Sequence, residues 1–203
     1  MGKTAMFNRF VDNTYTDEYA SNIGVAFKVK MFYLNENTGA ELKIWDTCGS
    51  EKLQSLTRQY YHDTHGAIIL FDLTEKKTFL SIQNWYNDIK ENGPNGTTIF
   101  LVGNKSDLVD SRAVSFEEAE NFAKSNNLKY LEESAKTGDN IELVFDKLAY
   151  DCVENSIRGN NQNEVLEVKS RTQNKGMINN LANNNAQPKI KIEKAKEKDE
   201  GCC

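Results

Sequence analysis

The sequence predicts an α/β domain built on a largely parallel sheet, followed by a tail of different composition. Residues 66–72 (GAIILFD) and 98–104 (TIFLVGN) are short, continuously apolar runs, which are typical of strands covered on both faces. Segments with helical periodicity lie between and after these runs. Buried strands that alternate with amphipathic helices indicate a parallel sheet with crossover helices.

A hairpin is expected ahead of the buried strands. Residues 25–34 (VAFKVKMFYL) alternate apolar with mostly polar side chains, which is the period of a half-exposed strand. Residues 35–39 have turn chemistry, and residues 40–46 (AELKIWD) alternate again. The hairpin would add an antiparallel strand to the sheet.

Three amphipathic helices are expected. The first has apolar side chains at three- and four-residue steps between Phe79 and Ile89. The second begins at a capping box, in which Ser115 is followed three residues later by Glu118. The apolar stripe of the last helix consists of Ile141, Val144, Phe145, Leu148 and Cys152.

The tail differs from the body in composition. Asparagine dominates from Asn155 to Gln187, and lysines alternate with acids from Pro188 to Glu200. Neither stretch has enough apolar residues to offset the entropy of ordering it. We therefore divide the chain into a folded domain, residues 1–158, and a disordered tail, residues 159–203.

Composition excludes several classes of protein. The net charge of -5 is of mixed sign and leaves no basic face for nucleic acid. No apolar run approaches the length that spans a bilayer. The 4 cysteines are too few and too poorly spaced for a disulfide scaffold or a zinc site, which indicates a reducing compartment.

Polar loops follow three of the expected strands. They are residues 45–49 (WDTCG), 103–107 (GNKSD) and 133–136 (ESAK). The last of them follows a short apolar strand at Tyr130-Leu131. Because ligands of open α/β sheets bind at the carboxyl ends of the strands, we expect a binding site on this edge.

The first residues, Met1 to Thr4, end in Gly-Lys-Thr, the last part of the phosphate-binding pattern G-x-x-x-x-G-K-[ST]. In that loop a lysine reaches the terminal phosphates and a hydroxyl binds Mg²⁺. Asp46 suits an outer-sphere Mg²⁺ contact, and Gly49 permits its N–H to approach a γ-phosphate. Three residues alone arise by chance, so other signals must decide.

The NKSD loop, residues 104–107, carries a carboxylate suited to guanine. Asp107 can accept hydrogen bonds from guanine N1–H and N2–H₂, whereas adenine would leave it unpaired. Lys105 can lay its stem along the base, and Asn104 can tie the loop to neighbouring backbone. In the SAK loop, residues 134–136, the Ala135 N–H suits guanine O6. Each loop taken alone is more often an ordinary turn or helix-entry loop.

In combination these segments resemble the Rab family of small GTPases, within the Ras superfamily. The resemblance covers residues 2 to about 157 and implies a P-loop NTPase three-layer sandwich that binds GTP or GDP with Mg²⁺ and hydrolyses GTP. It also implies a monomeric switch in vesicle traffic that cycles between cytosol and the cytoplasmic face of endomembranes. Its partners would be an exchange factor, an activating protein and effectors. The matching segments are IGVAF (23–27), WDTCG (45–49), YYHDTHG (60–66), ILFDLT (69–74), NKSDL (104–108) and ESAKTGDN (133–140).

The resemblance also implies roles for individual residues. The nucleotide would be bound by Gly2, Lys3, Thr4, Ala5, Tyr15, Asn22, Gly49, Asn104, Lys105, Asp107, Ser134, Ala135 and Lys136. Mg²⁺ would be held by Thr4, Asn22 and Asp46. The aromatic residues Phe27, Trp45 and Tyr60 would face effectors, and core packing is an equal alternative for them. Cys202 and Cys203 would carry paired geranylgeranyl groups, because two lipids anchor stably where one does not.

Three departures from the family pattern bear on activity. The family's first strand and the opening of its phosphate loop would lie upstream of Met1, so we expect a longer protein. Asn22 stands where the family has a Mg²⁺-binding Thr. Ser50, beside Gly49 in the catalytic segment, stands where the family has the Gln that positions water, so hydrolysis should be slow. The alternative function is a hydrolysis-deficient, membrane-anchored scaffold.

Overall fold

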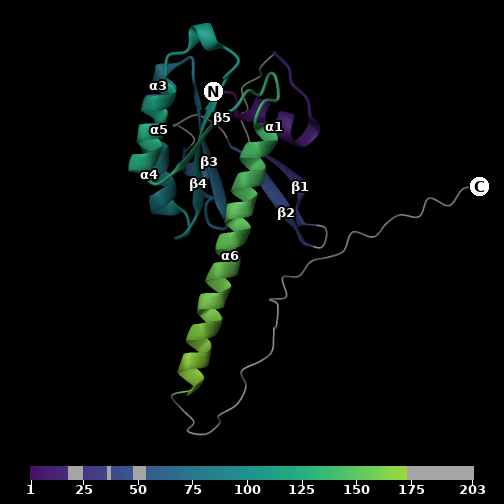
Figure 1. Ribbon diagram of the computed structural model, residues 1–203, viewed down its shortest axis with the longest axis vertical. Coiled ribbons are helices and arrows are strands. Elements are labelled where there is room, and N and C mark those ends of the chain that lie inside the picture. The colour runs from purple at the N-terminus through teal and green to yellow at the C-terminus, as the bar shows by residue number, and fades with distance from the viewer. Residues whose placement is uncertain (18–24, 36–37, 48–53, 173–203) are drawn as a thin grey trace, which may run out of the picture.

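The computed structural model describes the chain except for residues 18–24, 36–37, 48–53 and 173–203 (Figure 1). Helices and strands alternate through most of the described part. In chain order the elements are α1 (Lys3–Asp12), β1 (Ala26–Asn35), β2 (Thr38–Asp46), α2 (Gln54–Arg58), β3 (Gly66–Asp72), α3 (Lys76–Leu80), α4 (Ile82–Asn92), β4 (Thr98–Asn104), the 3-10 helix η2 (Val109–Ser111), α5 (Phe116–Ser125), β5 (Lys129–Glu132) and α6 (Ile141–Thr172).

The strands form two sheets. β3, β4 and β5 are parallel and lie in that spatial order, with Gly66 opposite Thr98. β1 and β2 are antiparallel, with Ala26 opposite Asp46. The predicted α/β class, a mostly parallel sheet with an antiparallel pair, is confirmed. Among the described strands β2 is not hydrogen-bonded to β3, so the pair forms a sheet of its own.

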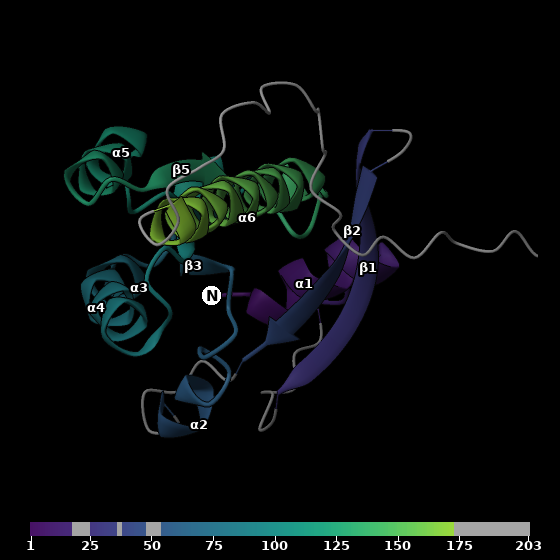
Figure 2. The same cartoon turned by 90° about the horizontal axis from the view of Figure 1, so that it is seen from below.

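Helices cover both faces of the parallel sheet. In β4, Leu101 packs on the side of α4 and α5, whereas Phe100 and Val102 pack on the side of α1 and α6. Figure 2 shows α3, α4 and α5 on one side of the sheet and α1 on the other. Because successive residues of a strand point to opposite faces, two covered faces require the continuous apolar runs seen in the sequence.

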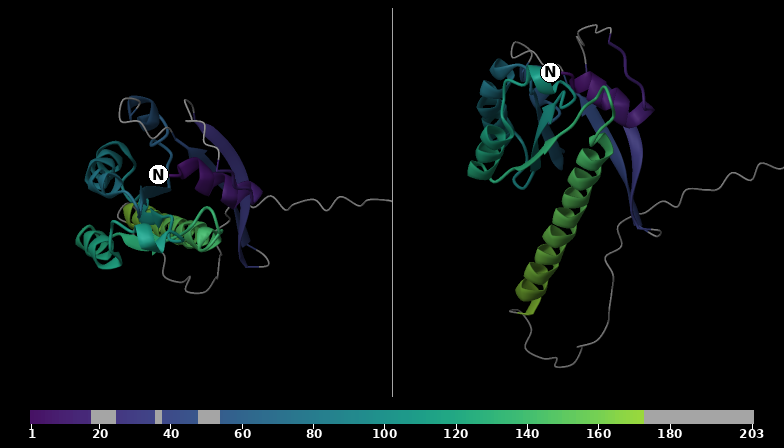
Figure 3. Two further views of the ribbon diagram at one scale, coloured as in Figure 1. Left: turned by 90° about the horizontal axis from the view of Figure 1, so that it is seen from above. Right: turned by 45° about the horizontal axis from the view of Figure 1, so that its top comes forward.

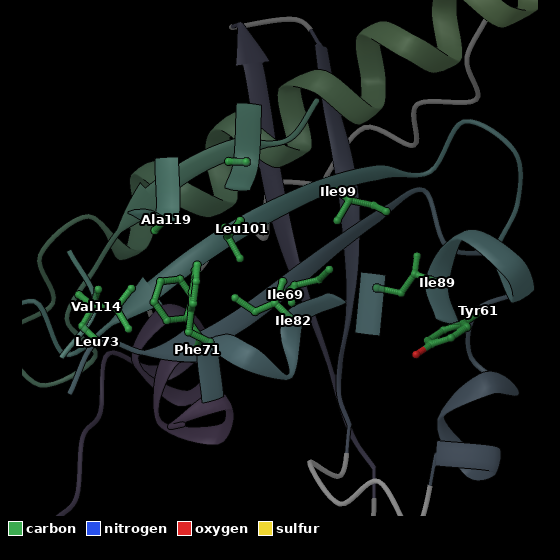
Figure 4. Close-up of a cluster of buried hydrophobic side chains, with 12 residues drawn as sticks. Tyr61, Ile69, Phe71, Leu73, Ile82, Ile89, Ile99, Leu101, Val114 and Ala119 are labelled. Carbon is green, nitrogen blue, oxygen red and sulfur yellow. The ribbon is translucent and has the colours of Figure 1, made fainter. Parts of the chain in front are cut away.

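The larger of the two apolar clusters joins the sheet to α4 and α5. Figure 4 shows Phe71 and Leu101 at its centre, with Ile82 and Ile89 of α4 and Ala119 of α5 around them. The side chains of Phe71 and Leu101 are wholly inaccessible to solvent, at 0% exposure. Such aromatic and branched side chains each stabilise the fold by roughly 1.5–3 kcal/mol on burial.

The helix α1 is an element that the sequence analysis missed. It buries Met6, Phe7 and Phe10, and the ring of Phe10 stacks on Phe145 of α6 with centroids 3.8 Å apart. The spacing of these apolar residues, at three- and four-residue steps, is the signal that could have found it. Figure 2 shows α1 between the β1–β2 pair and the parallel sheet, where it joins the two.

The predicted helices are present, with two differences. The segment from Phe79 to Ile89 is divided at Ser81 into α3 and α4. The capping box is confirmed, since Ser115 Oγ accepts a hydrogen bond of 3.1 Å from the Glu118 N–H. No helix in the described ranges is long and apolar enough to cross a membrane.

The last helix continues further than the sequence analysis expects. We placed the start of a disordered tail at residue 159, whereas α6 runs from Ile141 to Thr172. Once a helix is nucleated, each further residue adds a backbone hydrogen bond without a new nucleation cost, so a polar sequence can continue it. The remaining tail, residues 173–203, lies outside the described residues.

Candidate functional site

The candidate site lies where α1 begins and where β2, β4 and β5 end. Figure 3 shows the N-terminal end of the chain beside the loops that come after the parallel strands. Asn104, the last residue of β4, is only 2% exposed and joins these segments. Its Nδ2 donates to the Met1 carbonyl at 2.9 Å, and its Oδ1 accepts from the N–H groups of Lys105 at 2.6 Å and Ala135 at 3.4 Å. The predicted tie between Asn104 and neighbouring backbone is therefore present.

The backbone at Gly2 fits closely under Asn104. Gly2 has a φ of 89°, in the left-handed region, and caps the N-terminus of α1. A Cβ built at this position would lie 2.4 Å from Asn104 Nδ2. Both the backbone conformation and the available space therefore require glycine. Lys3, Thr4 and Ala5 occupy the first turn of α1, the end of a helix that attracts anions.

Thr4 and Asp46 meet at the same end of α1. The Thr4 Oγ1 donates a hydrogen bond of 2.6 Å to Asp46 Oδ2, across 42 residues of sequence. Asp46 ends β2 and is 4% exposed. A hydroxyl and a carboxylate oxygen are hard ligands of the kind that Mg²⁺ prefers, so this pair fits the predicted metal. In the described part of the chain no group of three His, Cys, Asp or Glu side chains could hold a metal by itself.

Asp107 in the NKSD loop is held by the SAK loop. The Ser134 Oγ donates to Asp107 Oδ1 at 2.6 Å and accepts from the Thr137 N–H at 3.1 Å. Ser134 is itself fully buried, so its hydroxyl has little freedom to turn. The two loops predicted to read a guanine base are thus joined to each other directly.

Lys105 is bound to a buried carboxylate. Its Nζ lies 2.6 Å from Asp72 Oδ2 at the end of β3, and its φ of 70° is unusual for a residue other than glycine. Burial by itself would raise the pKa of Asp72, but hydrogen bonds from Lys105 and Thr74 outweigh that effect and lower it. This pair fixes the course of the Lys105 stem beside Asn104.

Arg9 is a site residue that the sequence analysis missed. From α1 its Nε donates to the Ala135 carbonyl at 2.9 Å, and its Nη2 donates to the Lys136 carbonyl at 2.8 Å. Its guanidinium also lies 5.8 Å from the ring centroid of Tyr15, which places that predicted base contact beside the SAK loop. Lys136 Nζ reaches towards Asp17, 4.0 Å from Oδ1. No local sequence pattern signals a contact between residues this far apart.

The three aromatic residues predicted to face effectors form a row on the surface. The ring centroids of Phe27 and Trp45 are 4.4 Å apart, and those of Trp45 and Tyr60 are 4.9 Å apart. Phe27 is 44% exposed and Trp45 is 46% exposed. Phe27 and Trp45 are therefore largely exposed, whereas Tyr60 beside them is partly buried.

Several predicted site residues cannot be placed. Asn22, Gly49 and Ser50 lie outside the described residues, as do Cys202 and Cys203. The described elements on either side of Gly49 and Ser50 are β2, which ends at Asp46, and α2, which begins at Gln54.

Comparison with known proteins identifies the family. The family described as the Ras family matches residues 1–154. The GTP-binding protein ypt1 of Schizosaccharomyces pombe is 42% identical over 145 residues, 71% of this chain and 71% of the relative. The Ras-related protein Rab-1 of Theileria annulata is 44% identical over 149 residues, 73% of this chain and 67% of the relative. The GTP-binding protein YPT1 of Saccharomyces cerevisiae is 38% identical over 179 residues, 88% of this chain and 84% of the relative. The chain therefore belongs to the Ras family and, within it, to the Rab small GTPases.

Proposed function

We propose that this chain is a guanine-nucleotide switch of the Rab type, which binds GTP and GDP with Mg²⁺ and acts in vesicle traffic. The observation that carries the proposal is the position of Asn104. It joins the first residues of the chain, which lead into Thr4 beside Asp46, to the loops that bear Asp107 and Ala135. A phosphate end and a base end are thereby held on one edge of the fold.

Each end has its own chemistry. On the phosphate side, Lys3 contacts the β- and γ-phosphates at the positive end of the α1 dipole. Thr4, Asp46 and Asn22 would hold Mg²⁺, which would neutralise charge on the phosphate oxygens. On the base side, Asp107 accepts from guanine N1–H and N2–H₂. The Ala135 N–H, whose bond to Asn104 is long at 3.4 Å, donates to guanine O6.

The test of this function is base selectivity. In titrations of fluorescent GDP and ADP with Mg²⁺ present, the chain should prefer GDP by roughly a thousandfold or more, because a site built to hydrogen-bond guanine leaves Asp107 unpaired on adenine. Equal affinities for the two nucleotides would reject the assignment.

The proposal extends to membranes and partners. The row formed by Phe27, Trp45 and Tyr60 is the effector surface, and an exchange factor and an activating protein act on the switch. Cys202 and Cys203 carry geranylgeranyl groups that attach the protein to the cytoplasmic face of endomembranes, from which it cycles through the cytosol. Two lipids are needed because a single chain gives only marginal binding.

Hydrolysis of GTP should be slow, because Ser50 is too short to place a water in line with the γ-phosphate. We expect Ser50→Gln to raise the single-turnover rate at least tenfold, equal to about 1.4 kcal/mol of barrier. Ser55→Gln makes the same chemical change at an exposed position of α2 and should leave the rate unaltered. Asn22→Thr should mainly tighten Mg²⁺ and GTP binding.

The competing function is a membrane-attached scaffold that binds nucleotide without turning it over. It is favoured by the same residues, Asn22 and Ser50. If Ser50→Gln binds GTP tightly and its rate stays at the wild-type value, the position of Ser50 does not limit hydrolysis. Slow turnover would then have a cause other than the length of the Ser50 side chain.

A further inference from the structure

Glu133 is a buried acid that the proposed function does not use. Its side chain has 0% exposure, and its two carboxylate oxygens are the buried polar side-chain atoms without a hydrogen-bond partner in the described part of the chain. Burying a polar group without a partner is costly, and native structures hold few such groups. A buried carboxyl group without partners, next to a binding site, is a candidate for a functional role.

The position of Glu133 ties it to both loops of the base side. Its N–H donates to the Gly103 carbonyl at 2.9 Å, and its carbonyl accepts from the Ser106 N–H at 3.1 Å. The next residue is Ser134, which donates to Asp107. Burial, and after it the negative charge of Asp107, raise the pKa of Glu133 to about 8.

The positively charged side chains near these loops are paired with groups other than Glu133. Lys105 pairs with Asp72, and Arg112 pairs in a bidentate way with Glu132, the neighbour of Glu133. Arg9 donates to the carbonyls of Ala135 and Lys136. Other charged or titratable groups on the adjoining segments are Lys136 beside Asp17, Asp139 bound to Thr137, Tyr130 bound to Glu132, and the Met1 amino group, whose pKa is lowered by burial. Among the described contacts, none of these groups neutralises the Glu133 carboxylate.

We propose that Glu133 is a positioning residue for nucleotide binding: its neutral carboxylic acid lets the NKSD and SAK loops hold a guanine nucleotide, and its ionisation weakens that hold. This inference rests on the proposed function. It adds a dependence on pH that the roles of Asn104, Asp107 and Ala135 do not contain.

One physical effect couples Glu133 to the base. An ionised Glu133 requires solvation, which its buried position does not provide. To reach water it would have to shift the segment that carries Ser134 and Ala135, and so release Asp107 from its partner.

The sign of the pH dependence comes from this effect. Nucleotide binding favours the protonated acid, so affinity is constant at pH values where the free protein is already protonated. Affinity then falls as the pH rises through the pKa of the free protein, about 8. One unit of coupling corresponds to a tenfold change in affinity.

The experiment measures the Kd of labelled GDP, with Mg²⁺, between about pH 6.5 and 9 for three proteins. They are the wild type, Glu133→Gln, which is neutral and of the same size, and Glu91→Gln, an exposed control on α4. The Kd of the wild type and of the Glu91→Gln control should rise about tenfold across this range, and that of Glu133→Gln should stay nearly constant. Titration of the Met1 amino group and of guanine itself cancels, because both are common to all three proteins.

The outcomes separate the inference from the function on which it rests. If all three proteins bind GDP with the same pH profile, the inference is overturned and the proposed function stands. If none binds GDP at the lowest pH, the proposed function fails and the inference with it. Glu133→Met is a second neutral variant of similar length, and its profile should be as flat as that of Glu133→Gln if the charge is what matters.

Discussion

Asp107→Asn is expected to exchange the preference for guanine nucleotides for a preference for xanthine nucleotides. The Ser134 Oγ donates to Asp107 Oδ1 and has its own acceptor role filled by the Thr137 N–H. An amide at position 107 would keep its oxygen towards Ser134 and turn its NH₂ towards the base. Xanthine carries a carbonyl where guanine carries its 2-amino group, so the NH₂ would find an acceptor.

The expected size of this change is large. The substituted site would present a donor to the guanine amino group, and an unmatched polar contact in a formed site costs roughly a hundredfold to ten-thousandfold in specificity. Competition of unlabelled GDP and XDP against a fluorescent nucleotide measures both affinities on one protein. Asp110→Asn makes the same change at an exposed position of η2 and should leave the ratio of the two affinities unaltered. A loss of GDP binding without a gain for XDP would mean that Asp107 supports the loop and does not read the base.

Most of the sheet could be predicted because its signal is local. Residues 66–72 and 98–104 became strands with the predicted limits, since a strand covered on both faces must be apolar throughout. The hairpin was found by its alternation, within one residue at the start of β1 and two at the start of β2. The helix α1 was missed, although the spacing of Met6 and Phe10 is helical. Gly-Lys-Thr was interpreted as part of a phosphate-binding loop, whereas Lys3 and Thr4 already lie in the first turn of the helix.

The candidate site was predictable in its parts and not in its connections. Thr4, Asp46 and Asn104 could each be chosen for their chemistry and for their place after a strand or before a helix. Arg9 contacts residues of the SAK loop that lie 126 and 127 positions further along the chain. No local period encodes them. They exist because α1 packs between the two sheets and brings Arg9 to the loop that follows β5.

The aromatic row shows a different limit. Alternation along β1 places Phe27 on one face of the hairpin, and the register pairs it with Trp45. A period of two says which residues share a face, and it does not say whether another layer covers that face. Only the packing of the whole domain decides between core and surface, and here it leaves Phe27 and Trp45 exposed and Tyr60 partly buried.

Glu133→Gln is expected to stabilise the protein, and the gain should grow with pH. Because the pKa of Glu133 is about 8 in the folded chain and 4.5 for an ordinary glutamate, the folded state binds this proton more tightly than the unfolded chain does. The stability that Glu133 contributes is fully present below the unfolded value and is lost as the pH rises to the folded value. The loss is about 1.4 kcal/mol for each pH unit of that window, several kcal/mol in all. Urea unfolding of the wild type and of Glu133→Gln, at intervals from acid to mildly alkaline pH, measures the difference between their free energies of unfolding.

The adjacent residue provides a control of opposite sign. Burial would raise the pKa of Glu132, but hydrogen bonds from Arg112 and Tyr130 outweigh that effect and lower it. Glu132 therefore contributes stability that is present at neutral pH and lost in acid, so Glu132→Gln should destabilise the protein at neutral pH, and less so as the pH falls. Two neighbouring Glu→Gln changes, identical in chemistry, should thus move stability in opposite directions, because the carboxylate of Glu132 has partners and that of Glu133 has none among the described residues. If Glu133→Gln also destabilises the protein at high pH, the carboxylate of Glu133 gains a partner when it ionises, and its burial carries no net cost.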